Sequence, residues 1–460
     1  MTRPFRWRSA AASRRGSAAN HSGVLMQASV AAIAEAVGAA RLHRAIALAD
    51  GAGQQMAAIA GKGATSWRGR KVVVICSKQD EASGAAQYAA YHARKLGALP
   101  LLFPLPSASA TVDSAKSAVA AGSSVGADAI IGFGGRGVHE AARAAAMLMT
   151  NEGKVPEYAS GMGDRSPEHA PLPCVLVPSI GTGRECARSA TLISEGATSL
   201  PVRFHADAEG PGLGVSGGTA GIVLDPTVLR RASVWESAEA ASAALVCALE
   251  FLLRPEVSPE AAGAAMVAVR VASRSLQLLS SEAVVAAASG RPHADRDAAM
   301  CMSAAASVAA SAAAAAASPL SEASGIASAL ACAAEARYDV EARVIIALCG
   351  PAALDARAEA LDAAADCGEE GAEEAIARGE AAAGAMRECG LEGEALCDLV
   401  ESANDRSGAS RGREGPLEDL TPADLANIAA GAESEPGAGL SLGGATRAEL
   451  VSVLEAGLDL

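Results

Sequence analysis

Aromatic side chains are scarce in this chain of 460 residues. Phe, Trp and Tyr together make up 3% of it, whereas apolar residues make up 50%. No lysine follows Lys154, although arginines continue to the end. We interpret this bias as the codon usage of a GC-rich genome, so runs of alanine need not indicate a coiled coil. The length and the apolar fraction still allow two or three domains with buried cores.

An excess of basic charge is also missing. The formal net charge of −14 argues against a nucleic-acid partner or an anionic membrane. The run from Ala299 to Ser318 is long enough to span a membrane but contains no Leu, Ile or Phe, so we predict a helix packed inside the protein. The partners expected are a small-molecule substrate or nucleotide and a second subunit, either identical or paralogous.

The chain has 10 cysteines but no C-x-x-C pair, which is typical of reduced, mostly buried thiols. No acid precedes Glu35, and the first residues carry arginines among alanines and serines. This composition predicts that residues 1–27 are a mitochondrial or plastid transit peptide. The alternative is a disordered basic tail on a cytoplasmic protein.

Short β-branched runs alternate with helical stretches between Arg70 and Asp225. The predicted strands are Lys71–Cys76, Ala98–Phe103, Asp128–Phe133 and Pro173–Pro178. This alternation indicates a parallel sheet covered on both faces, so we predict an α/β, Rossmann-like nucleotide-binding domain over residues 45–232.

The β signal vanishes from Ser233 onward, and residues 233–460 predict an all-α helical domain. Helix breaks are expected at four places: Arg254-Pro255, Ser289-Gly-Arg-Pro292, Ser318-Pro319 and Gly350-Pro351. Polar, Gly-rich connectors are expected near residues 404–415 and 431–444.

Two of the predicted strands open into glycine loops, Gly132-Phe-Gly-Gly-Arg-Gly137 and Pro178-Ser-Ile-Gly-Thr-Gly183. Glycines let backbone N–H groups approach an anion, and a following helix N-terminus adds partial positive charge. A tight strand-to-helix turn would explain the first loop alone equally well. Two such loops at strand ends favour a dinucleotide or another phosphorylated ligand.

The loops resemble motifs of the iron-type (group III) alcohol dehydrogenase family. Gly134-Gly-Arg-Gly-Val-His-Glu140 is similar to its G-G-G-S-x-x-D loop, and the helix that follows ends at Met149-Thr-Asn151. Pro178-Ser-Ile-Gly-Thr-Gly-Arg-Glu185 is similar to its P-T-T-A-G-T-G-S-E loop, one residue shorter, and Leu224-Asp-Pro226 matches a Val-Asp-Pro tripeptide. The resemblance covers about residues 45–350.

The resemblance implies that NAD or NADP binds at these loops. The residues expected to contact the cofactor are Gly134, Gly135, Gly137, Ser179, Thr182, Gly183 and Ser77. Arg136 and Arg184 depart from the family pattern and could either strengthen anion binding or fill the cofactor's space. Ser77, followed by Lys78, stands where many members place a ribose-binding aspartate, so NADP is at least as well supported as NAD.

The resemblance also implies a metal site formed by one Asp and three His, the first two at i and i+4 on one helix. The corresponding positions here are Ala243, Cys247, Ala310 and Ser324. Residues 233–460 contain one histidine, His293. We therefore expect neither Fe nor Zn.

Three functions remain open. The chain could be an oxidoreductase on small alcohols, aldehydes or hydroxy and oxo acids, with reduced or metal-independent activity. It could be a pseudoenzyme that binds a nucleotide or a partner subunit, or a sensor of a phosphorylated ligand. No catalytic residue is assigned, and the histidines of the first half are candidates in principle only: His92, His139, His169 and His205.

Overall fold

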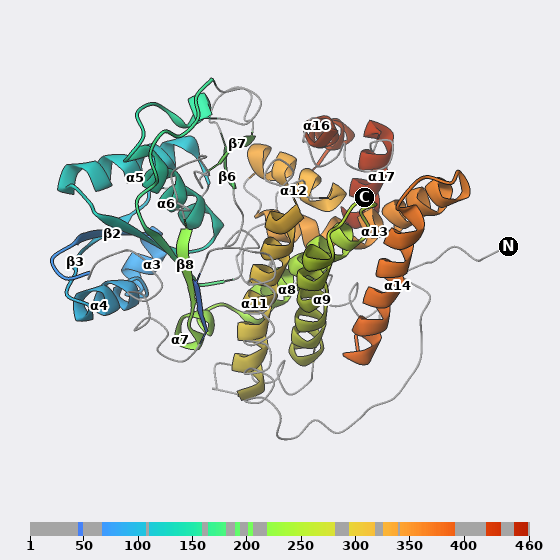
Figure 1. Cartoon of the computed structure of the whole chain (residues 1–460), viewed down its shortest axis with the longest axis horizontal. Coiled ribbons are helices and arrows are strands. Elements are labelled where there is room, and N and C mark those ends of the chain that lie inside the picture. Colours follow the sequence, from blue (N-terminus) through green and yellow to red (C-terminus); the bar gives the residue numbers. More distant parts are fainter. Residues whose placement is uncertain are drawn as a thin grey trace. The chain divides into compact units, whose positions relative to one another are not determined.

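The computed structural model describes twelve stretches of the chain: residues 45–48, 67–106, 110–158, 164–180, 189–193, 201–205, 219–280, 294–317, 325–338, 341–391, 420–433 and 446–458. They fall into two compact units (Figure 1). One is the α/β unit, Leu42–Arg231, and the other is the helical unit, whose described residues lie between Ala232 and Leu460.

The α/β unit contains a six-stranded sheet in the order β1-β8-β5-β4-β2-β3, in which every pairing is parallel. Its strands are β1 (Ala45–Leu48), β2 (Lys71–Cys76), β3 (Leu99–Pro104), β4 (Ala129–Gly134), β5 (Cys174–Pro178) and β8 (Thr219–Leu224). An antiparallel pair, β6 (Ser189–Ile193) and β7 (Pro201–His205), lies outside this sheet. The predicted parallel sheet is confirmed, and four strands are added to those expected from the sequence.

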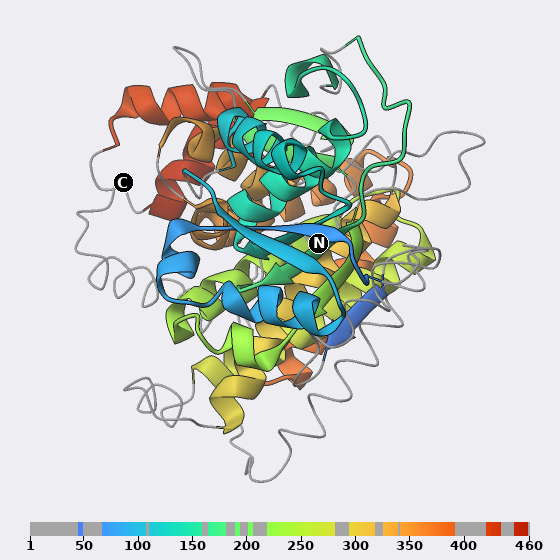
Figure 2. The same ribbon diagram turned by 90° about the vertical axis from the view of Figure 1, so that its left-hand side faces the viewer.

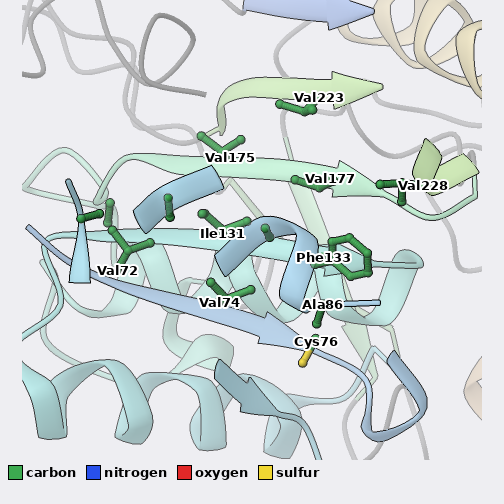
Figure 3. Close-up of a cluster of buried hydrophobic side chains, with 14 of the residues drawn as sticks. Val72, Val74, Cys76, Ala86, Ile131, Phe133, Val175, Val177, Val223 and Val228 are labelled. Atoms are coloured by element: carbon green, nitrogen blue, oxygen red, sulfur yellow. The ribbon is translucent and has the colours of Figure 1, made fainter. Parts of the chain in front are cut away.

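Helices cover both faces of the sheet (Figure 1). They are α3 (Lys78–Ala82), α4 (Gln87–Lys95), α5 (Val112–Val125), α6 (Arg136–Leu148) and α7 (Pro226–Leu229), with a 3-10 turn at Val155–Tyr158. Alternate strand side chains point to opposite faces. Val74 and Ile131 belong to the core under α4 (Figure 3), whereas Val73 and Ile130 pack against α5 and α6. The sheet is thus buried on both sides.

Strand β3 forms one edge of the sheet, the edge turned toward the viewer in Figure 2. Leu99 N–H donates to the carbonyl of Arg70, and Leu105 N–H donates to that of Cys76. Odd-numbered residues of β3 therefore direct their amides toward β2, and even-numbered positions face away. Two of those outward positions are Pro100 and Pro104, which carry no N–H.

The helical unit contains α8 (Val234–Leu252), α9 (Pro259–Leu279), α11 (Ala294–Ala317), α12 (Ile326–Arg337), α13 (Ala342–Asp366), α14 (Ala372–Glu388), α16 (Pro422–Glu433) and α17 (Arg447–Leu458). Ser233 begins α8 with a capping box, in which Ser233 Oγ accepts from Glu236 N–H and Glu236 accepts from Ser233 N–H. Small side chains let α8, α9 and α11 pack closely. The predicted all-α character is confirmed.

The predicted break at Gly350-Pro351 is wrong, because α13 continues through both residues. Pro351 cannot donate to the carbonyl of Ala347, which costs helix stability. Packing of α13 against α8, α12, α14 and α17 outweighs that cost. Gly350 lies against Val246, where any side chain would overlap.

Residues 1–27 and 404–415 fall outside the described residues, as do two of the expected helix breaks, Ser289-Gly-Arg-Pro292 and Ser318-Pro319. The first three residues of the connector expected near 431–444 belong to α16, which continues to Glu433, and the others lie outside the described residues. Most of the run from Ala299 to Ser318 forms the helix α11, as expected, and its described side chains are buried. Within the described residues, no helix is both long and apolar enough to cross a membrane.

Candidate nucleotide-binding site

The strand order creates a switch point between β2 and β4. The chain runs from β2 outward to β3, and then returns to place β4 on the other side of β2. The connections after β2 and β4 therefore diverge to opposite faces of the sheet. Ligands of open α/β sheets bind at such points, beyond the carboxyl ends of the strands.

The loop after β4 is shaped for close approach of an anion. Gly134 adopts φ +144°, a conformation that favours glycine. Gly135 is the N-cap of α6 and supplies no side-chain cap for the first helical N–H groups. A methyl group added at Gly135 would meet no described atom within 4 Å. The N-terminus of α6 is thus open to a ligand.

The second glycine loop begins beside the first. Gly134 pairs with Pro178 in the sheet, and the N–H of Ser179 donates to the carbonyl of Gly134 at 3.0 Å. Ser179 therefore lies at the same edge as Gly134 and Gly135. Thr182 and Gly183, like Arg184, lie outside the described residues.

Gly137 and Arg136, which the sequence also places in the first glycine loop, differ in their exposure. Gly137 is buried in the first turn of α6, so it packs the helix and does not line the loop surface. Arg136, the first residue of α6, is half-buried and makes contacts of its own.

Ser77 has a role that was not predicted. It is the N-cap of α3: its Oγ accepts from Asp80 N–H at 2.9 Å and donates to Asp80 Oδ2 at 2.6 Å. That carboxylate oxygen lies 3.1 Å from the position that a Cβ would take on Gly134. The sequence has Ser77 where the family has an aspartate, but the structure places the carboxylate of Asp80, three residues further on, beside Gly134. The Ser77-Lys-Gln-Asp80 spacing of a capping motif was the available signal.

The carboxyl end of β2 is electronegative as a result. Burial raises the pKa of the Cys76 thiol to about 12, and the nearby carboxylates of Asp80 and Glu81 contribute. Cys76 is thus a protonated core residue and not a nucleophile.

His139 is fully buried on α6, two residues past the glycine loop. Burial lowers its pKa to about 3, and the nearby charge of Arg143 acts in the same direction. It cannot act as an acid near neutral pH. His92 on α4 is also buried, and burial lowers its pKa as well.

Comparison with known proteins identifies this arrangement. Residues 51–207 match the family described as iron-containing alcohol dehydrogenase. The fold agrees with the crystal structure of a 1,3-propanediol oxidoreductase at a TM-score of 0.64 and 18% identity, over 90% of this chain and 97% of that one. The iron-containing alcohol dehydrogenase of Thermotoga maritima gives 0.66 and 15%, over 91% and 99%. The chain is therefore similar to the iron-containing alcohol dehydrogenases over residues 51–207 and shares their fold.

Two characterised relatives resemble parts of the chain. Long-chain-alcohol dehydrogenase 1 of Geobacillus thermodenitrificans is 28% identical over 151 residues, 33% of this chain and 35% of that protein. Sulfoacetaldehyde reductase of Bilophila wadsworthia is 35% identical over 83 residues, 18% of this chain and 21% of that protein. The chain thus matches about a third or less of the length of these relatives.

The structure describes three of the four positions that the sequence predicts to correspond to the metal ligands of iron-containing alcohol dehydrogenases. Ala243 and Cys247 lie on α8 and Ala310 lies on α11, with both alanines buried. Cys247 Sγ lies 3.4 Å from Ser328 Oγ on α12. Ser324, like His293, falls outside the described residues. Within the described part of the chain, no group of three or more His, Cys, Asp or Glu is placed to hold a metal ion.

A buried carboxylate, missed in the sequence, joins two of these helices. Glu250 on α8 accepts a hydrogen bond of 2.8 Å from Ala327 N–H in the first turn of α12. A Cβ at the N-cap Gly325 would overlap the carboxylate, so a larger residue there would require Glu250 to move. Burial raises the pKa of Glu250 to about 7, against the Ala327 hydrogen bond and the charges of Arg254 and Arg357.

Proposed function

We propose that the chain is an NAD- or NADP-dependent oxidoreductase that acts on small alcohols, aldehydes or hydroxy and oxo acids with low turnover. The observation that carries this is the hydrogen bond from Ser179 to Gly134, which joins the two glycine loops at the switch point. The family match over residues 51–207 and the names of the relatives, an alcohol dehydrogenase and an aldehyde reductase, support the substrate class.

The chain's own residues would hold the cofactor, whose nicotinamide supplies the hydride donor or acceptor. The open N-terminus of α6 at Gly135 presents backbone N–H groups to the pyrophosphate, and its partial positive charge favours that anion. Ser179 brings a hydroxyl to the same edge. Arg136 adds positive charge at the start of α6.

Low turnover is supported by the residues at the metal-ligand positions. A bound metal that polarises the reacting oxygen is worth several kcal/mol, roughly 10³-fold in rate. The methyl side chains of Ala243 and Ala310 offer no lone pair, and Cys247 offers one thiol. The same residues favour a second function, namely nucleotide or partner binding without turnover.

Calorimetric titration of the purified full chain with NAD⁺ and NADP⁺ tests the proposal, together with metal analysis and oxidation of NADH and NADPH over a panel of aldehydes and oxo acids. Saturable binding with slow turnover supports the oxidoreductase, and binding with no turnover supports the second function. Absence of binding to both NAD⁺ and NADP⁺ contradicts the oxidoreductase and the nucleotide-binding form of the second function. Stoichiometric Fe or Zn with fast turnover contradicts the low-activity proposal.

A further inference from the structure

We infer that the site selects a dinucleotide whose adenosine ribose keeps a free 2′-hydroxyl, and that Asp80 is the residue that makes this selection. The inference rests on the proposed function and makes it specific, because it chooses NAD over NADP. It reverses the expectation drawn from Ser77, since the carboxylate missing there is supplied by Asp80.

The position of Asp80 is fixed by Ser77. The Ser77 hydroxyl donates to Oδ2 and also accepts from the Asp80 backbone N–H, so side chain and backbone are held together. Oδ1 accepts no hydrogen bond from the residues that the structure describes. Asp80 is half-buried, which leaves this oxygen available to a donor from a ligand.

The site places this carboxylate beside the glycine loop. Oδ2 lies 3.1 Å from the Cβ position of Gly134, at the junction of the loops that follow the paired strands β2 and β4. In dinucleotide sites of doubly wound sheets, the pyrophosphate lies on a glycine loop and an acid at the end of the neighbouring strand binds the ribose hydroxyls. The same relationship exists here, with the acid at Asp80.

The chemistry of a carboxylate then distinguishes the two cofactors. An ionised carboxylate only accepts hydrogen bonds, so it binds a ribose diol as acceptor. A 2′-phosphate offers no comparable donor and brings negative charge next to negative charge. A hydrogen bond to a charged group is strong enough to change affinity by about tenfold or more.

Calorimetric titration of the full chain with NAD⁺ and NADP⁺ tests the inference, with Asp80→Asn as the isosteric variant and Glu81→Gln as the control. Glu81 is the adjacent carboxylate, and its loss changes the net charge equally. We expect wild type to bind NAD⁺ about tenfold or more tightly than NADP⁺. Asp80→Asn should erase most of this ratio, whereas Glu81→Gln should keep it.

Ser77→Ala provides a second variant, because it leaves the Asp80 charge in place and removes only the group that orients it. We expect the ratio of the NADP⁺ to the NAD⁺ dissociation constant in Ser77→Ala to lie between the ratios of wild type and Asp80→Asn. Circular dichroism of each variant separates loss of folding from loss of selectivity. Tighter binding of NADP⁺ by wild type, or an unchanged ratio in folded Asp80→Asn, overturns the inference and leaves the proposed function standing. Binding of neither nucleotide by wild type overturns the proposed function and the inference with it.

Discussion

Tyr88 donates a hydrogen bond of 2.5 Å to Oδ2 of Asp225, although 137 residues separate the two. Asp225 is fully buried at the N-cap of α7, where its other oxygen accepts from the backbone and hydroxyl of Thr227. The phenol therefore completes the hydrogen bonding of a buried charge. The hydrogen bond also connects α4 to the carboxyl end of β8. The glycine loops follow the carboxyl ends of the neighbouring strands.

Tyr88→Phe should destabilise the α/β unit by about 1.5–3 kcal/mol, because a hydrogen bond to a buried charged group is lost while the ring remains. Urea unfolding followed by circular dichroism measures this. Tyr91→Phe on the same helix is the matched control, since Tyr91 is 50% exposed and its hydroxyl makes no such bond to a buried carboxylate. Equal stability of the two variants would contradict the assigned role of Tyr88.

Gly134 and Gly135 should respond differently to alanine. At Gly134 the φ of +144° and the nearby Asp80 carboxylate oppose a side chain. Gly134→Ala should therefore lower the free energy of unfolding by about 1–3 kcal/mol, and it should also weaken nucleotide binding. At Gly135 the backbone is ordinary and the space is open, so stability should change by less than about 0.5 kcal/mol. Nucleotide affinity should still fall, because the methyl group occupies the approach to α6. Tight binding by folded Gly135→Ala would show that the ligand does not use this loop.

Glu250 should make the helical unit less stable as the pH rises. Its pKa is about 7 in the folded chain and 4.5 ordinarily, so the native state holds more protons than the unfolded state between these values. Stability contributed by this group is therefore greatest below about pH 4.5 and falls through pH 7. In Glu250→Gln the amide oxygen can still accept from Ala327, and the slope should disappear. Hydrogen exchange of α8 and α12 at several pH values measures it, with the exposed Glu256→Gln as control.

His139 should make the α/β unit less stable as the pH falls. Its pKa falls from 6.5 to about 3 on folding, so the unfolded state binds the extra proton between these values. Stability should decrease as the pH falls below about 6.5. His139→Leu removes the titrating group and should protect the amides of α6 at pH 5 relative to wild type. His169→Gln, which replaces an exposed histidine, should leave exchange unchanged; the same acid sensitivity in His139→Leu would assign it elsewhere.

The sequence was sufficient for the elements whose local chemistry leaves little choice. Lys71–Cys76 is a run of β-branched residues too short for a helix, and it forms β2. Ala45–Leu48 was not among the predicted strands, and alanine and leucine favour helices, yet the segment pairs with β8. Strand pairing decides such segments, and pairing is not written in local propensity. Pro351 was misjudged for the same reason, since helix packing overrode it.

In the candidate site, too, some residues could be predicted from the local sequence, whereas others depend on how distant elements pack. Gly134 and Gly135 could be predicted as site residues from the sequence, because they belong to one of two glycine loops that follow strands. Asp80 could not, because its closeness to Gly134 depends on β4 lying beside β2. Glu250 and Ala327 are likewise joined across 77 positions by helix packing alone.

The two prolines of β3 set a limit on assembly. A neighbouring chain that tried to lengthen the sheet at this edge would find Leu102 as the one outward amide among Pro100, Leu102 and Pro104. The added strand would lack most of the backbone hydrogen bonds in which β3 acts as donor. A second copy that met the sheet at β3 would therefore bind through side chains, and the sheet would not become wider there.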